Sequence, residues 1–129
     1  MIVVDASVLI EVLPRRSAGA AAESRLKAPG QLVAAPHHFD LEVANVLRKL
    51  ALCEIDPKRV ALALDDLKAI PIIRWSHATR LPRIWALRNN LSAYDAAYVA
   101  LAEAPNAPLL TSDRRLASAP GHHAAIELI

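Results

Sequence analysis

Cysteine, glycine and aromatic residues are all scarce in this chain of 129 residues. The single cysteine, Cys53, excludes an intrachain disulfide and a cysteine-based zinc site. Cys53 falls in an apolar run, so we expect it to be a small buried hydrophobic residue rather than a nucleophile. The three glycines leave little room for a phosphate-binding loop, and neither GxGxxG nor GxxxxGKS/T occurs. The sequence therefore contains no common nucleotide-binding motif.

Long hydrophobic runs and a targeting segment are also missing. No stretch approaches the ~18 apolar residues that a membrane span requires. The start of the chain lacks the basic residues of a signal peptide and carries Asp5 within its apolar stretch. The net charge of +2 is mildly basic, which permits a nucleic-acid partner without arguing for one. We therefore expect a soluble, cytoplasmic protein with no membrane partner.

Aliphatic residues must build the core, because 54% of the chain is hydrophobic and only 4% is aromatic. A chain of this length is the size of one domain and buries roughly two-thirds of the surface of its unfolded state. We expect one domain spanning residues 1–129, with a core of alanine, leucine, valine and isoleucine.

Strand-like and helix-like patterns alternate along the chain. Short apolar runs predict strands at residues 2–4, 31–35, 71–75, 109–111 and 124–128. Spacing, caps and composition predict helices at about 7–13 (ended by Pro14), 18–26, 38–50, 57–69, 76–88 and 93–103, and a short helix through Leu116. This alternation indicates an α/β fold with a central parallel sheet and helices on both sides.

The first strand is the expected centre of that sheet. Residues 1–9 form an apolar run interrupted by Asp5 and by the small residues Ala6 and Ser7. Such a run suits a strand that is covered on both faces. A carboxylate at the carboxyl end of this strand would lie where open α/β sheets bind their ligands.

Four acids occupy positions that invite a functional interpretation. Asp5 and Asp113 follow predicted strands, Glu42 borders the apolar stripe of a helix, and Asp95 lies in the first turn of an apolar helix. Each also has an ordinary explanation: the two strand-end acids could be turn residues, Glu42 a solvated helix residue, and Asp95 a favourable charge at a helix start. Taken one at a time, none of the four establishes a site.

Their combination predicts a metal site. Strand ends and helix starts meet at one edge of a parallel sheet, so the four acids should converge there. Converging carboxylates repel one another, and a divalent cation stabilises them. Oxygen ligands select hard ions, Mg²⁺ or Mn²⁺, which polarise a phosphodiester and activate water.

Several neighbours could assist these acids. Ser7, Thr111 and Ser112 could support the carboxylates by hydrogen bonds. Arg114 and Arg115 could hold a phosphate backbone, or they could simply be the solvated start of a helix.

The histidines stand in two adjacent pairs. Adjacent side chains point in different directions, so neither pair makes a ready chelate. We expect His37, His38, His122 and His123 to be solvated loop residues, with helix entry as a further role for the first pair.

The ordered motifs resemble PIN-domain proteins, specifically VapC-type toxins of bacterial toxin–antitoxin pairs. The segments that carry the resemblance are residues 3–9 (VVDASVL), 41–47 (LEVANVL), 91–101 (LSAYDAAYVAL) and 110–116 (LTSDRRL). The resemblance implies a PIN-like three-layer α/β/α sandwich and a Mg²⁺- or Mn²⁺-dependent endoribonuclease that cleaves RNA and so inhibits translation and growth. It also implies a VapB-type antitoxin partner and a homodimer.

The resemblance assigns roles to the same four acids. Asp5 and Asp95 would be direct metal ligands, and Glu42 and Asp113 would complete the acidic site. All four acids are present in this chain. The RNA target is not carried over, because targets differ widely among such toxins.

Two alternatives remain beside the nuclease. One is a catalytically inactive RNA- or protein-binding module on the same fold; four clustered acids argue against it, because without a metal they would repel a phosphate backbone. The other is a phosphatase-like α/β hydrolase that works through an aspartyl phosphate. Such an enzyme usually has a second acid close to the first, whereas Ala6 and Ser7 follow Asp5 here.

Overall fold

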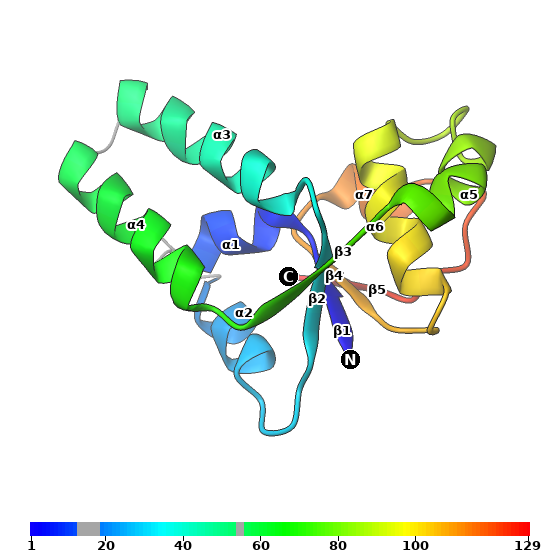
Figure 1. Cartoon of the computed structure of the whole chain (residues 1–129), viewed down its shortest axis with the longest axis horizontal. Helices are drawn as coiled ribbons and strands as arrows, with labels where there is room; N and C mark the ends of the chain where they lie inside the picture. The colour runs from blue at the N-terminus through cyan, green and yellow to red at the C-terminus, as the bar shows by residue number, and fades with distance from the viewer. Residues whose placement is uncertain (13–18, 54–55) are drawn as a thin grey trace.

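A five-stranded parallel sheet organises the fold (Figure 1). The computed structural model describes residues 1–12, 19–53 and 56–129. The strands are β1 (Ile2–Val4), β2 (Val33–Pro36), β3 (Ile72–Trp75), β4 (Leu109–Thr111) and β5 (Ile126–Leu128). They lie in the order β3-β2-β1-β4-β5, and every neighbouring pair is parallel. The predicted central parallel sheet is confirmed, with β1 in its middle.

Strand β1 is central because all of its side chains are apolar and can be covered on both faces. Ile2, Val3 and Val4 are completely buried. Val3 pairs with Ala34 of β2 on one side and Leu109 of β4 on the other. This double pairing fixes the position of whatever follows β1 in the sequence.

Helices cover both faces of the sheet, as the three-layer prediction requires (Figure 1). On one side lie α1 (Ala6–Val12), α2 (Gly19–Leu26), α3 (Phe39–Cys53) and α4 (Pro57–Ala69); on the other lie α5 (Leu81–Ala86), α6 (Ala93–Glu103) and α7 (Arg114–Ser118). A 3-10 turn, η1 (Ala78–Arg80), precedes α5. None of the described helices is long and apolar enough to cross a membrane.

Helix α6 has the predicted bounds, and most of it is buried. Every residue from Ala96 through Ala102 is buried. The hydroxyl of Ser92 accepts a hydrogen bond from the backbone N–H of Asp95, which makes Ser92 the N-cap. Because α6 consists largely of alanine and other apolar residues, it can pack closely on the sheet and hold its first turn in place.

The helix predicted over residues 76–88 is wrong. The chain forms η1 and the six-residue α5 instead, with Pro82 in the first turn of α5. Proline lacks an N–H and restricts the residue before it, so one continuous helix is interrupted here.

Three strands also differ in their bounds from the prediction, and β3 does so only by beginning at Ile72. Strand β2 begins at Val33 and includes Pro36, because its register is set by Ile2 of β1 and Trp75 of β3. Strand β5 begins only at Ile126, where pairing with β4 starts. The predicted role of Pro14 and the burial of the Cys53 side chain lie outside what the structure describes.

An arginine–glutamate pair ties α5 to α6. Arg83 donates two hydrogen bonds to Glu103, of 2.7 and 2.8 Å, and a third to the carbonyl of Gly121. The Glu103 side chain is only 7% exposed, and it also accepts a hydrogen bond from the backbone N–H of His123. Arg83 therefore lowers the pKa of Glu103, so the folded state favours its charged form.

We expect Glu103→Gln to lower the free energy of unfolding by about 1.5–3 kcal/mol at pH 7, because hydrogen bonds to a charged group are lost. Since the folded pKa lies below the ordinary value of 4.5, this stabilisation is present above that value and is lost as the pH falls through the folded pKa. Urea unfolding at several pH values measures the difference. Asp65→Asn, in an exposed pair with Lys68, is the control and should change stability little. An equal effect of both variants would contradict this account.

Candidate active site

The predicted acids lie at the carboxyl edge of the sheet. Asp5 directly follows β1, and Asp113 comes two residues after the neighbouring strand β4. Glu42 lies in the first turn of α3 and Asp95 in the first turn of α6. The fold therefore brings two strand ends and two helix starts together, as the sequence predicts.

Asp5 is a buried carboxylate held by neutral hydroxyl groups. It is only 7% exposed. Thr111 donates a hydrogen bond of 2.8 Å to its Oδ2, and Ser7 donates to the same oxygen. The Ser7 hydroxyl accepts a hydrogen bond of 3.0 Å from the backbone N–H of Ser112. Three of the residues expected to support the acids thus surround Asp5.

Glu42 is held by α6. The hydroxyl of Tyr98 donates a hydrogen bond to its Oε2. Tyr98 is completely buried, so this bond both satisfies a buried hydroxyl and fixes the carboxylate. Burial and the bond to Glu42 raise the pKa of Tyr98, which keeps its proton on the phenol.

Asp95 lies beside its own helix cap. Ser92 Oγ donates a hydrogen bond of 2.8 Å to Asp95 Oδ2 while it accepts from the Asp95 backbone N–H. The positive end of the α6 dipole lies at this turn and favours the charged carboxylate.

Three of the acids act on one another electrostatically. Burial raises the pKa of Asp5, its hydroxyl partners lower it, and the charge of Asp95 raises it further. Burial likewise raises the pKa of Glu42, against the hydrogen bond from Tyr98, and the charges of Asp5 and Asp95 add to the rise. The folded protein therefore holds negative charge here at an energetic cost, which a bound cation would relieve.

Asp113 has different hydrogen-bond partners from the other three acids. Its carboxylate is the N-cap of α7 and accepts hydrogen bonds from the backbone N–H groups of Arg115, at 2.7 Å, and Leu116, at 3.4 Å. Arg114 and Arg115 are exposed, and Arg115 Nε lies 3.9 Å from Asp113 Oδ1. Asp113 thus lies at the carboxyl edge of the sheet, as predicted. Its carboxylate, however, caps a helix, which agrees with its ordinary explanation as a turn residue.

The carboxylate oxygens of these acids suit a hard cation that takes few of its ligands from the protein. In the part of the chain that the structure describes, no three His, Cys, Asp or Glu side chains are arranged so that they could hold a metal ion. Mg²⁺ usually keeps several waters and takes only one or two carboxylates from the protein. The charges that raise the pKa of Asp5 and Glu42 match this kind of site better than an all-protein cage.

Sequence reasoning missed His38. It was expected to be solvated, but its side chain is only 14% exposed and its Nε2 lies 3.8 Å from Glu42 Oε2. Its ring packs edge-on against Tyr94 and Tyr98, with centroids 5.6 and 5.1 Å apart. The spacing of His38 and Glu42, four residues apart at a helix start, was the signal that could have found it. His122 is half-buried, while His37 and His123 are exposed.

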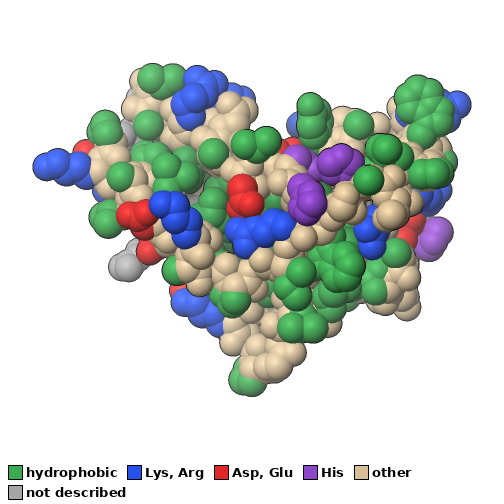
Figure 2. Space-filling view, in the orientation of Figure 1, with side chains coloured by type: hydrophobic (Ala, Val, Ile, Leu, Met, Phe, Trp, Pro, Cys, Tyr) green, Lys and Arg blue, Asp and Glu red, His purple; other side chains and the backbone are tan. Residues whose placement is uncertain are grey.

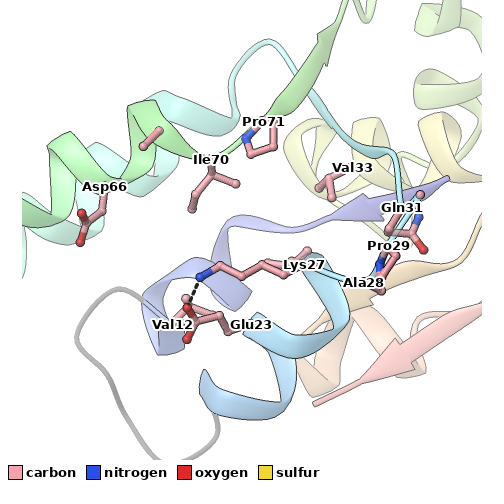
Figure 3. Close-up of a pocket in the computed structure, with 13 residues that line it drawn as sticks. Val12, Glu23, Lys27, Ala28, Pro29, Gln31, Val33, Asp66, Ile70 and Pro71 are labelled. Carbon is pink, nitrogen blue, oxygen red and sulfur yellow. Dashed lines mark hydrogen bonds and ion pairs between the residues drawn. The ribbon is translucent and has the colours of Figure 1, made fainter.

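A cavity of about 720 Å³ lies elsewhere, between the ends of α1, α2 and α4 (Figure 3). Lys27 crosses it and pairs with Glu23, and Gln31, Asp66 and Ile70 contribute to its walls. None of the four candidate acids lines this cavity.

The variant Tyr98→Phe tests how much the hydrogen bond from Tyr98 to Glu42 contributes to stability. We expect the free energy of unfolding to fall by about 1.5–3 kcal/mol, because a buried hydrogen bond to a carboxylate is lost while the ring stays in the core. Tyr94→Phe, on the exposed turn of the same helix, is the matched control and should leave stability nearly unchanged. Chemical denaturation of both variants measures the difference. If Tyr98→Phe is no less stable than wild type, the Tyr98–Glu42 bond contributes little.

Comparison with known proteins places the chain in a family. The PIN domain model matches residues 2–121. Ribonuclease VapC12 of Mycobacterium tuberculosis is 40% identical over 131 residues, which cover 100% of this chain and 99% of the relative. Ribonuclease VapC1 of the same organism is 41% identical, covering 98% of this chain and 96% of the relative.

Solved structures agree with the fold. The protein PAE2754 of Pyrobaculum aerophilum has a TM-score of 0.72 at 27% identity, covering 97% of this chain and 81% of that one. Mycobacterium tuberculosis VapC20, described as a Sarcin-Ricin loop cleaving toxin, has a TM-score of 0.69 at 14% identity, covering 92% and 94%. The chain therefore belongs to the PIN-domain family, in its VapC group.

Proposed function

We propose that the chain is a metal-dependent endoribonuclease, a single PIN domain over residues 1–129, which acts as the toxin of a toxin–antitoxin pair. Cleavage of RNA would inhibit translation and growth. The observation that carries this proposal is the coupled group of Asp5, Glu42 and Asp95 at the carboxyl edge of the sheet. Relatives of about 40% identity that are named ribonucleases over nearly their full length support it.

We infer Mg²⁺, or Mn²⁺, as the metal. Asp5 and Asp95 would hold the ion directly, and Glu42 and Asp113 would complete the acidic site. When bound, the ion would polarise the phosphodiester and lower the pKa of an attacking water. Ser7 and Thr111 keep the Asp5 carboxylate in place through their hydrogen bonds.

The remaining side chains of the site have supporting roles. Tyr98 orients Glu42 without neutralising its charge. The Ser112 backbone N–H fixes Ser7, and the exposed Arg114 and Arg115 are available for phosphate contacts beside the acids. These contacts position the substrate backbone but do not select a sequence.

We also propose the partners that the VapC group implies. The protein would be neutralised by a VapB-type antitoxin and would act on RNA in the cytoplasm as a homodimer. Solved structures similar to this chain, described as a toxin–antitoxin complex from Klebsiella pneumoniae and as VapBC2 from Rickettsia felis, support the antitoxin. The alternative of an inactive binding module is disfavoured because all four acids are present and three of them are electrostatically coupled.

Asp5→Asn should reduce RNA cleavage by more than about 100-fold, since loss of even a supporting partner of a metal ligand costs 10- to 100-fold. Growth inhibition should disappear with it, while circular dichroism shows an unchanged fold. Asp65→Asn, which changes an exposed acid of α4, is the control and should cleave as wild type does. A folded Asp5→Asn protein that stays toxic would rule out the assignment.

Metal binding can be measured without activity. A cation that binds only the folded state adds about 2.7 kcal/mol of stability at a hundredfold excess over its Kd. We expect Mn²⁺ or Mg²⁺ at millimolar concentration to raise the Tm of the wild-type protein, and Asp5→Asn and Asp95→Asn to lose this shift. Asp65→Asn should keep it. An absent shift in the wild type, or an equal one in all variants, would count against this metal site.

A further inference from the structure

We propose that Tyr94 is the surface on which a base of single-stranded RNA stacks while the neighbouring phosphodiester lies at the carboxylates. This inference rests on the proposed ribonuclease function and adds a substrate-binding residue to it. Tyr94 is one of only five aromatic residues in the chain, and it immediately precedes Asp95 in the first turn of α6.

Tyr94 is open to solvent but held at the rim of the acid site. Its side chain is 63% exposed. A single exposed aromatic residue is ordinary by itself. Here, however, the ring contacts His38 with centroids 5.6 Å apart and planes at 62°. Because this contact is edge-on and most of the residue is exposed, a face of the tyrosine ring remains available.

His38 connects this ring to the acids. Its ring also contacts Tyr98, and its Nε2 lies 3.8 Å from Glu42 Oε2. The His38 side chain is further hydrogen-bonded to the backbone of Tyr94. The imidazole of His38 thus lies between the exposed ring of Tyr94 and the carboxylate of Glu42. An RNA strand whose phosphate reaches the acids therefore brings a base near Tyr94.

The charge at the site favours base stacking as the means of holding RNA. Unless a cation neutralises them, the three neighbouring carboxylates repel a phosphate backbone, so a contact that does not depend on the backbone charge helps to hold the strand at this point. Stacking on an uncharged aromatic ring attracts the base and is insensitive to this repulsion. Exposed aromatic side chains are the usual platforms for unpaired bases in RNA-binding proteins.

The surroundings of Tyr94 fit RNA better than an apolar protein surface. Histidine side chains gather on one face of the molecule (Figure 2). His37 and His77 are exposed and lie with their ring centroids 6.5 Å apart, and the charge of His77 acts on His38. The imidazole of His38 against the tyrosine ring, with the exposed His77 acting on His38, offers a base rings and polar groups rather than an apolar patch.

The test uses the full chain with Asp5→Asn, so that RNA is bound but not cut. Fluorescence anisotropy compares a short oligoadenylate with an abasic ribose–phosphate oligomer of the same length, for proteins with tyrosine, phenylalanine, leucine or alanine at position 94.

We expect Tyr94→Ala to weaken oligoadenylate binding by about 5- to 150-fold, the measured range for removal of one stacking ring. Tyr94→Phe should bind like the parent, and Tyr94→Leu should be weakened, because it keeps apolar bulk without a ring. The abasic oligomer should bind all four proteins equally.

Three results would overturn the proposal: equal binding of both probes by the parent protein, an equal loss for both probes in Tyr94→Ala, or unchanged oligoadenylate binding by Tyr94→Ala. If the last result came with a change of oligomeric mass on size-exclusion chromatography, Tyr94 would belong to a protein interface instead. Cleavage by the chain with both Asp5 and Tyr94 intact tests the ribonuclease function separately. RNA cleavage that is lost in Asp5→Asn but fully retained in Tyr94→Ala would therefore refute only the stacking role.

Discussion

The burial of one carboxylate at the end of the central strand is the constraint on which the site depends. Asp5 follows a strand that is paired on both sides, so its backbone cannot move without disturbing the sheet; its own N–H donates to the carbonyl of Leu110. A buried charge is costly unless it is hydrogen-bonded. Thr111 at the end of β4 and Ser7 at the start of α1 supply those bonds, which makes the two adjoining elements part of the site.

Only two of the five aromatic residues, Phe39 and Tyr98, are completely buried, and Tyr98 has a large share in the architecture. Helix α6 packs mainly through alanine and aliphatic side chains, and Tyr98 is the one large polar side chain that it buries. A buried phenol needs a hydrogen-bond partner, and Glu42 of α3 provides it across the top of the sheet. The same contact therefore joins the two helical layers and positions an acid.

Local signals made much of this arrangement predictable. The apolar residues of β1 and the Ser92 cap of α6 are determined by nearby sequence, so the places of Asp5 and Asp95 followed from them. Pro82 was a local signal too, but its effect on the helix was underestimated. The environment of His38 could not be predicted in the same way, because its contact with Tyr94 and Tyr98 joins segments more than fifty positions apart. The N-cap role of Asp113, by contrast, is local, because its carboxylate accepts from backbone N–H groups only two and three positions further along the chain.

The partners of the acids separate the ion-paired carboxylates from those of the proposed site. Outside this group of acids, Asp40, Glu103 and Glu127 each take paired hydrogen bonds from an arginine, which largely neutralises them. At the edge, Asp5, Glu42 and Asp95 receive hydrogen bonds from the hydroxyls of serine, threonine and tyrosine. A hydroxyl orients a carboxylate but leaves its negative charge unpaired, so the repulsion among the three acids persists in the folded protein. Because arginines are used freely elsewhere in the chain, the choice of neutral donors at this edge is what keeps the charge available to a cation.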